Sequence, residues 1–137
     1  MILGYGRGQV AELIKMVWGE DVVIDGVDLF LTEGVNGYND LWHGSADRFL
    51  QKVCVKKYDY VVVDIYNGDK IPDFVFTEEF VKGLAQVTKK ILGVNATFTE
   101  WEQWQIYQKY FDIDVFKRVN HQHGIEKVFM ANPREIK

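Results

Sequence analysis

The chain of 137 residues is poor in cysteine and proline and has no long apolar run. Its only cysteine, Cys54, excludes an intramolecular disulfide and favours a reducing compartment. Gly4 interrupts the amino-terminal apolar segment, so this segment does not have the pattern of a secretory signal. No segment reaches the ~20 apolar residues that cross a bilayer as a helix. We therefore expect a cytoplasmic protein that does not insert into a membrane.

Linkers and charge runs are missing as well. Only Pro72 and Pro133 occur, and no repeat or low-complexity tract divides the chain, so we expect one domain over residues 1–137. The net charge is -4 without a long run of either sign, which counts against a nucleic-acid partner. The chain does have 47% hydrophobic and 15% aromatic residues, enough for a packed core without a disulfide or a metal.

The first nine residues, Met1-Ile-Leu-Gly-Tyr-Gly-Arg-Gly-Gln9, are the most informative segment. A short apolar run leads into Gly4, Gly6 and Gly8, and an amphipathic stretch follows, which predicts a strand, a glycine turn and a helix. Bare backbone N–H groups and the positive end of the helix dipole favour an anionic group at such a turn. The alternative is an ordinary glycine-rich turn without a ligand.

The helix after the turn should cover residues 9–18 and end at Gly19. Its inward-facing stripe is expected to consist of Val10, Leu13, Ile14 and Val17. A second strand, Val22–Asp28, follows, and Asp28 lies 20 residues beyond Gly8. In a nucleotide-binding βαβ unit this is the position of a carboxylate that accepts hydrogen bonds from ribose hydroxyls. The alternative is a solvated aspartate at the end of a strand.

The segment Tyr60-Val-Val-Val-Asp64 predicts a strand that is buried on both faces of a parallel sheet, because β-branched residues follow one another without alternation. Asp64 ends this strand, and ligands of open α/β sheets bind at the carboxyl ends of strands. The polar loop over residues 66–72 is expected to form a wall or lid of the same pocket. Alternatively, Asp64 caps that loop through backbone N–H groups.

Further elements are expected between and after these segments. Residues 29–41 should hold a short helix with loops, and residues 42–44 a short strand. A helix should then begin at Ser45 or Asp47, with apolar positions Phe49, Leu50 and Val53. Thr77 should cap another helix, whose buried stripe is Phe80, Leu84, Val87 and Ile91. A fifth strand is expected over residues 91–98.

Thr99 is predicted to cap a helix that runs to about Phe111. Its aromatic residues recur at helical spacing, and they are Trp101, Trp104, Tyr107 or Tyr110, and Phe111. Such a stripe usually belongs to the core. If it is exposed, it marks an interface, through which the chain would form a homo-oligomer.

The chain ends in a predicted antiparallel hairpin of two strands, about Asp114–Asn120 and Glu126–Ala131, joined through His121-Gln-His-Gly124. A His-x-His pair suits a metal, but no third ligand is evident, so no metal site is expected. His43 is expected to be structural, since no nucleophile or carboxylate accompanies it in the sequence.

In the order and spacing of these segments the chain resembles the class I S-adenosylmethionine-dependent methyltransferases, and within them the spermidine synthase-like (polyamine synthase) branch. The matching segments are Ile2–Gly8, Gly26–Leu29, His43–Leu50, Tyr58–Tyr66, Gly68–Pro72 with Thr77–Phe80, and Val94–Phe98. Their collinear order over nearly the whole chain carries the resemblance. It implies an α/β, Rossmann-like, doubly wound and mostly parallel sheet of about seven strands, with a C-terminal antiparallel β-hairpin.

The same resemblance implies roles for the site residues. Gly4, Tyr5, Gly6 and Gly8 would pass beneath the methionine and ribose of S-adenosylmethionine, or of its decarboxylated form. Asp28 would hold the ribose hydroxyls, with Leu29 as a further cofactor contact, and Ser45 and Ala46 would lie by the adenine. Asp64 would lie near the sulfonium and the acceptor, where a carboxylate attracts an ammonium group and takes its proton. Tyr66 would contact the cofactor and, with Asn67 and Asp69, the substrate.

The sequence also departs from polyamine synthases. Ser45 replaces the acidic residue before the adenine site, and Asn67 replaces the second acid of the Asp-x-x-Asp pattern. The β-rich region that precedes the first strand of those enzymes has no counterpart here, which leaves the acceptor side open to water. A nicotinamide-dependent oxidoreductase ranks lower, because Gln9 stands where its turn needs the third glycine.

The leading hypothesis is therefore a small methyltransferase that binds S-adenosylmethionine and acts on a small-molecule acceptor, such as an amine. One alternative is a spermidine synthase-like aminopropyltransferase. The other is a catalytically silent member of the fold that binds a partner protein.

Overall fold

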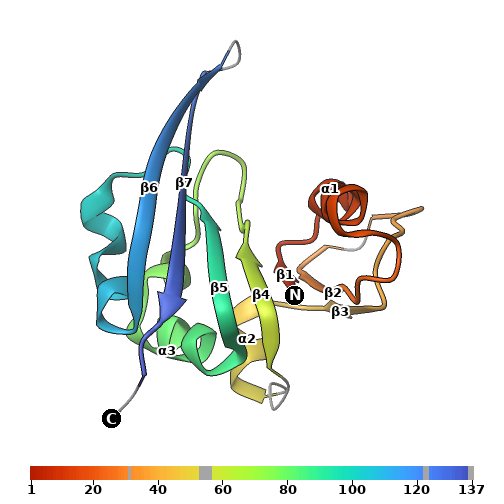
Figure 1. Cartoon of the computed structure of the whole chain (residues 1–137), viewed down its shortest axis with the longest axis horizontal. Coiled ribbons are helices and arrows are strands. Elements are labelled where there is room, and N and C mark those ends of the chain that lie inside the picture. Colours follow the sequence, from red (N-terminus) through yellow and green to blue (C-terminus); the bar gives the residue numbers. More distant parts are fainter. Residues whose placement is uncertain (31, 53–56, 122–123, 136–137) are drawn as a thin grey trace.

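The computed structural model describes residues 1–30, 32–52, 57–121 and 124–135, and it describes side chains outside residues 115–126. One sheet contains seven strands (Figure 1), namely β1 (Ile2–Leu3), β2 (Asp25–Asp28), β3 (Asp40–His43), β4 (Tyr58–Val63), β5 (Thr88–Asn95), β6 (Phe111–His121) and β7 (Gly124–Pro133). The α-helices are α1 (Gln9–Trp18), α2 (Ala46–Lys52) and α3 (Glu78–Val87). Two 3₁₀ helices complete the described structure, η1 (Asp73–Phe76) and η2 (Trp101–Lys109).

The strand order is β3-β2-β1-β4-β5-β7-β6. The first five strands run parallel, β7 runs antiparallel to β5, and β6 pairs with β7 in an antiparallel hairpin. This arrangement confirms the predicted Rossmann-like fold with its C-terminal hairpin. Because β1 lies between β2 and β4, the loops that follow these three strands meet at one edge of the sheet.

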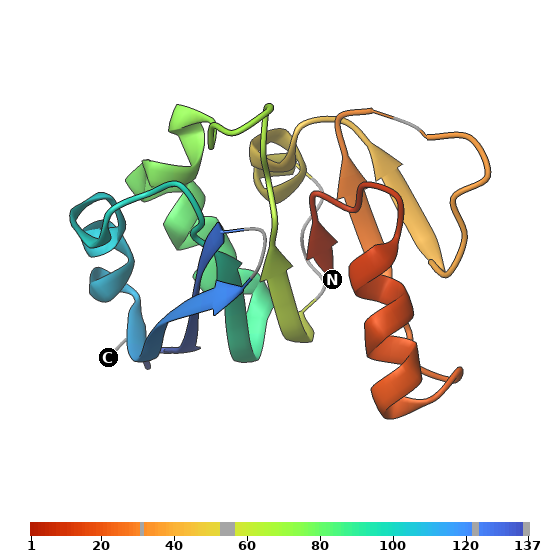
Figure 2. The ribbon, with the colours of Figure 1, turned by 90° about the horizontal axis from the view of Figure 1, so that it is seen from above.

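The two faces of the sheet are covered differently. Helices α2, α3 and η2 lie on one side and α1 lies on the other (Figure 2). The larger core cluster is on the side of α2 and α3, and it contains Leu84, Val61, Leu92 and Phe129 from α3, β4, β5 and β7. A smaller cluster of Ile2, Tyr5, Ala11 and Ile24 lies under α1. The sheet is thus well covered on one side and only partly covered on the other.

This uneven cover corrects two expectations of burial. On α1, Val10 and Ile14 are half-buried, but Leu13 and Val17 are exposed. On β4, Tyr60 is 40% exposed, so this strand is not buried on both faces. In both cases the sequence has the apolar pattern of a buried element, but the cover is incomplete. Leu13 and Val17 lie on the outer side of α1, and the Trp18 ring at the end of α1 stacks on Tyr60 without burying it.

Several boundaries also differ from the predicted ones. Residues 29–41 contain no helix in the described positions, because Gly34 and Gly37 adopt positive φ angles that break a helical path. The strand expected from Val22 begins at Asp25. Ile91 belongs to β5 and not to the stripe of α3, since α3 ends at Val87 and extended backbone starts at Thr88.

The helix expected from Thr99 to Phe111 is a 3₁₀ helix over Trp101–Lys109, and Phe111 already starts β6. Glu100 is its N-cap and forms a reciprocal capping box with Gln103, while Thr99 accepts a hydrogen bond from Trp104 Nε1 at 2.7 Å. By contrast, Thr77 caps α3 as predicted and accepts a hydrogen bond from the Phe80 amide.

The aromatic stripe of η2 belongs to the core. Trp104, Tyr107 and Phe111 are fully buried, and the Trp104 ring packs against Phe76 and Phe129. These aromatic side chains are therefore not available for the homo-oligomer contact that the sequence assigned to this segment.

Replacing Trp104 with alanine is expected to lower the free energy of unfolding by about 3–5 kcal/mol, because it removes a fully buried indole from packed aromatic neighbours. Urea denaturation followed by circular dichroism measures this change. Trp101, which lies half-buried on the same helix, is the matched control, and its alanine variant should lose much less. Equal losses for the two variants would contradict the assignment of Trp104 to the core.

Three expectations fall on residues outside the described structure. Cys54 and Val53 lie in the segment 53–56, and the turn of the final hairpin includes residues 122 and 123. The side chains of His121 and His123, the candidate metal pair, likewise lie outside the described structure. Among the described residues, no group of three metal-ligating side chains occurs, and no helix is long and apolar enough to cross a membrane.

Candidate functional site

The glycine turn connects β1 to α1 with three positive φ angles, 86° at Gly4, 57° at Gly6 and 82° at Gly8. An added Cβ at Gly4 would lie 2.0 Å from the Asp64 carbonyl oxygen, so Gly4 is needed where the turn meets the end of β4. An added Cβ at Gly6 would meet nothing within 4 Å. Gly4 is therefore required for the turn to pack against the backbone of Asp64, whereas the space beside Gly6 is open to a ligand.

Asp28 lies at the carboxyl end of β2, and its side chain contacts the glycine turn. Its carboxylate accepts hydrogen bonds from the Gly6 amide at 2.6 Å and the Phe30 amide at 2.9 Å. One backbone donor occupies each oxygen, which fixes the orientation of the carboxylate and leaves a second lone pair on each. Asp28 thus acts as a cap of two loops and still has the capacity to accept hydrogen bonds from a diol.

The segment after β3 forms the next wall. The Gly44 amide donates to the Asp28 carbonyl oxygen at 2.8 Å, which brings the start of α2 beside the end of β2. Ser45 directs its hydroxyl to Asp47, and Ala46 presents a small apolar surface. His43 Nε2 lies 2.8 Å from the Leu29 carbonyl oxygen, which fits the structural role expected for this histidine.

A polar cluster lies where β4 and β5 end. Asn95 Nδ2 donates to Asp64 Oδ1 at 3.1 Å. The Tyr66 hydroxyl lies 3.1 Å from both the Asn95 carbonyl oxygen and Asn95 Oδ1, and 3.0 Å from the Thr97 carbonyl oxygen. Asn95, at the end of the neighbouring strand, thus contacts both Asp64 and Tyr66 and orients their side chains.

A single pocket of about 660 Å³ joins these loops. Its wall includes, among the residues predicted for the site, Gly4, Tyr5, Gly6, Asp28, Leu29, Ser45, Ala46, Asp64, Tyr66 and Asn67. The volume is in the range of small-molecule and cofactor sites. Gly4 and Asn67, which are 63 positions apart in the sequence, thus line one cavity at the carboxyl edge of the sheet.

Two predicted residues are outside this wall. Gly8 is the N-cap of α1, and its amide donates a hydrogen bond to the Tyr5 carbonyl oxygen at 3.0 Å. Asp69 lies on the loop beyond Asn67. Tyr5 contributes to the wall but is itself buried, with its hydroxyl donating to the Asn36 carbonyl oxygen at 2.8 Å. Burial raises the pKa of the Tyr5 phenol, which therefore stays protonated at neutral pH.

The sequence analysis missed several residues of the site. Phe30, Thr32 and Phe74 also line the pocket, and Asn95 contacts Asp64 from β5. Phe30 follows Asp28 and Leu29 directly in the sequence, and this position next to two predicted site residues was a usable signal. Asn95 had a weaker signal, namely its position at the end of the strand that pairs in parallel with β4.

No protein-family model and no curated protein matches the sequence. Solved structures do match the fold over nearly the whole chain. Magnesium protoporphyrin IX methyltransferase from Synechocystis PCC 6803, with bound S-adenosylmethionine, has a TM-score of 0.67 at 11% identity, covering 97% of this chain and 68% of that one. The 1,6-didemethyltoxoflavin-N1-methyltransferase of Burkholderia thailandensis has a TM-score of 0.72 at 12% identity, covering 98% and 71%.

The N-methyltransferase NodS of Bradyrhizobium japonicum WM9, in complex with S-adenosylhomocysteine, has a TM-score of 0.70 at 10% identity, covering 98% of this chain and 76% of that one. At such low identities these similarities establish the fold alone. The chain therefore has the fold of class I S-adenosylmethionine-dependent methyltransferases. The narrower resemblance to polyamine synthases stays a prediction.

Proposed function

We propose that the protein binds S-adenosylmethionine in the pocket at the carboxyl edge of the sheet and transfers its methyl group to a small-molecule acceptor. The observation that carries the proposal is the single cavity that unites the glycine turn, Asp28, the start of α2 and Asp64. Similar structures with bound S-adenosylmethionine or S-adenosylhomocysteine support the choice of cofactor.

The chemistry of the wall fits this cofactor. Gly4 and Gly6 would pass beneath its methionine and ribose, since the space beside Gly6 is free of protein atoms. Asp28 would accept the ribose hydroxyls on its remaining lone pairs, with Leu29 beside it. The adenine would lie by Ser45 and Ala46. Apolar side chains nearby, such as Phe30 and Phe74, suit an aromatic base.

When bound, the cofactor supplies a methyl group on a positively charged sulfur, which makes the methyl carbon electrophilic. Asp64 would hold an acceptor amine beside that carbon and take its proton, since an ammonium group has no lone pair for attack. With the amine held there, the bond from its nitrogen to the methyl carbon would form as the carbon–sulfur bond breaks, and S-adenosylhomocysteine would be the leaving group. Tyr66 and Asn67 line the pocket beside Asp64 and would contact the acceptor, together with Asp69 on the loop that follows.

Aminopropyl transfer from decarboxylated S-adenosylmethionine is the second candidate. The cluster of Asp64, Tyr66 and Asn95 favours it, because one carboxylate and two neutral polar groups suit a primary amine. Ser45 and Asn67 count against it, since both lack the charge that stands at these positions in polyamine synthases. This candidate includes the proposal that the chain belongs to the spermidine synthase-like branch.

Thermal unfolding with four ligands in parallel tests the proposal. S-adenosylmethionine and S-adenosylhomocysteine should each raise the melting temperature, because a ligand at ~100 times its dissociation constant adds about 2.7 kcal/mol to the free energy of unfolding. A larger rise with decarboxylated S-adenosylmethionine would favour aminopropyl transfer. NAD should give no rise.

The matched variants are Asp28→Asn and Asp69→Asn, which remove one negative charge each. Asp28→Asn should shrink the rise because it weakens the acceptor for the ribose hydroxyls, and Asp69→Asn should leave it unchanged because Asp69 is outside the pocket wall. If no ligand raises the melting temperature of the parent chain, the cofactor proposal fails. A rise without turnover on any amine would favour the catalytically silent, partner-binding alternative.

Two further expectations stay predictions. The first is that residues 1–137 form a single methyltransferase-like domain. The second is that the protein works in the cytoplasm, which cell fractionation tests directly.

A further inference from the structure

The wall of the pocket contains charges of both signs. Its acidic residues are Asp28 and Asp64, and Arg7 is the one cation among the described residues that line it. Arg7 lies between Gly6 and Gly8 in the glycine turn, and it is exposed. Its side chain forms no hydrogen bond or ion pair with the part of the chain that the structure describes. The pocket thus offers a cationic side chain to an anionic group of a ligand.

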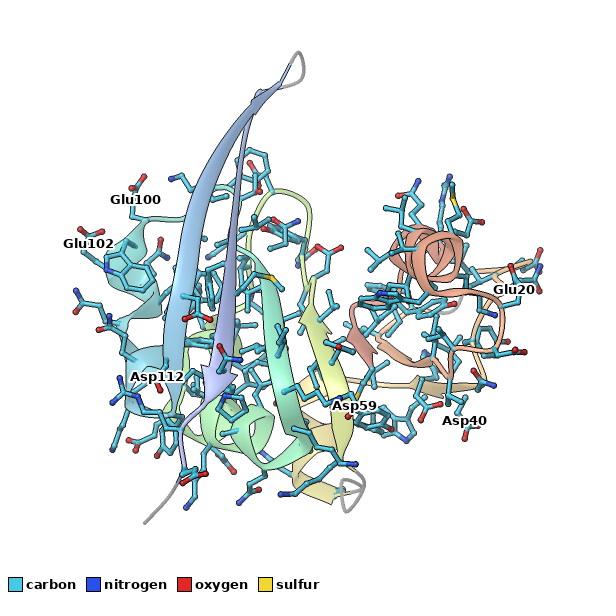
Figure 3. All side chains as sticks on the ribbon, in the orientation of Figure 1. Glu20, Asp40, Asp59, Glu100, Glu102 and Asp112 are labelled. Carbon is cyan, nitrogen blue, oxygen red and sulfur yellow. The ribbon has the colours of Figure 1, made fainter. Side chains whose placement is uncertain are left out.

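The acidic residues around this part of the fold do not neutralise Arg7. Asp28 directs its carboxylate to two backbone amides, at 2.6 and 2.9 Å. Glu12, on the first turn of α1, is outside the pocket wall. Three other acids lie at or before the amino ends of strands, at the edge of the sheet opposite the pocket, namely Glu20, Asp40 and Asp59 (Figure 3). The guanidinium of Arg7 is therefore available to a bound molecule.

The two candidate donors differ in one charged group. At neutral pH the amino-acid end of S-adenosylmethionine has a carboxylate and an ammonium group, whereas the decarboxylated form has the ammonium group alone. A guanidinium attracts a carboxylate and offers it two parallel N–H donors, but it repels an ammonium group. Arg7 should therefore favour the donor that has the carboxylate.

The proposed position of the cofactor brings its amino-acid end to this part of the wall. With the adenine by Ser45 and Ala46 and the ribose at Asp28, the amino-acid end would extend away from α2 and along the glycine turn. Arg7 directly follows Gly6, over which the ribose is proposed to lie, and both residues line the pocket. A long, exposed arginine side chain on that turn can reach a carboxylate at this end of the pocket.

We propose that Arg7 binds the carboxylate of S-adenosylmethionine and thereby selects this donor over its decarboxylated form. The inference rests on the proposed function and extends it, because it names the residue that decides between methyl and aminopropyl transfer. S-adenosylhomocysteine retains the carboxylate, so Arg7 should bind the product as well as the donor. A ligand without the amino-acid end should bind independently of Arg7.

Isothermal titration calorimetry with four ligands tests the role of Arg7. They are S-adenosylmethionine, its decarboxylated form, S-adenosylhomocysteine and 5′-methylthioadenosine, which lacks the amino-acid end. Arg7→Gln should weaken the binding of the two ligands with a carboxylate ~10-fold or more and leave that of 5′-methylthioadenosine unchanged. Arg7→Lys should keep most of the preference, because the positive charge remains. Arg7→Glu should reverse the preference, since its carboxylate would attract the ammonium group of the decarboxylated form.

The matched control is Arg48→Gln, the same substitution at an exposed position of α2 outside the pocket wall, and it should change none of the four dissociation constants. Near-ultraviolet circular dichroism establishes that each variant is folded. If 5′-methylthioadenosine binds and Arg7→Gln keeps the preference of the parent chain for S-adenosylmethionine, the role of Arg7 is overturned and the proposed cofactor stands. A parent chain that binds the decarboxylated form more tightly also overturns the role of Arg7. If none of the four ligands binds, the proposed function fails and this inference fails with it.

Discussion

Replacing Asp64 with asparagine is expected to lower turnover ~100-fold or more while leaving the binding of S-adenosylmethionine nearly unchanged. Asparagine has the same shape, and its Oδ1 still accepts the hydrogen bond from Asn95 Nδ2. The local structure should therefore persist. What is lost is the negative charge that holds an ammonium group and the base that takes its proton.

The rate of S-adenosylhomocysteine formation with a panel of small amines measures the loss, and ligand-dependent thermal unfolding measures binding. The residual rate of Asp64→Asn should rise with pH, because the free amine becomes the main form of the acceptor without help from a carboxylate. Asp21→Asn is the control, with the same change of charge at an exposed position between α1 and β2 that is outside the pocket wall, and it should keep most of the activity. Unchanged turnover in Asp64→Asn would remove Asp64 from the mechanism.

The sequence predicted the parts of the site that local chemistry determines. Three glycines after a short apolar run indicate a turn, and the turn has the expected positive φ angles. Asp28 ends β2 and Asp64 directly follows β4, and parallel strands bring their carboxyl ends to one edge, so both residues line one pocket. The roles of these residues with a cofactor are still predictions.

Other features depend on neighbours that periodicity does not reveal. Asn95 contacts Asp64 across 31 positions of sequence, and only the pairing of β4 with β5 brings them together. Leu13 and Val17 have the spacing of a buried stripe, yet both are exposed, because the pattern encodes an apolar surface and not what covers it.

Replacing Gly4 with alanine is expected to lower the free energy of unfolding by roughly 3–5 kcal/mol, the upper range for a single substitution. The new Cβ would lie 2.0 Å from the Asp64 carbonyl oxygen, and backbone atoms have no rotamer by which to move away. The φ angle of 86° adds further strain to any residue with a Cβ. Urea denaturation measures the loss.

Gly6→Ala is the matched substitution two residues later in the same turn. It should lower the free energy of unfolding by only about 1 kcal/mol. Alanine can adopt the left-handed region at the Gly6 φ angle of 57°, and no atom lies within 4 Å of the new Cβ. Gly6 lines the pocket, so this methyl group would take up open space beside the turn, over which the ribose is proposed to lie. Gly6→Ala should therefore stay folded and lose the thermal shift with S-adenosylmethionine. If Gly6→Ala keeps the full shift, the turn is a structural connection and the cofactor does not pass over it.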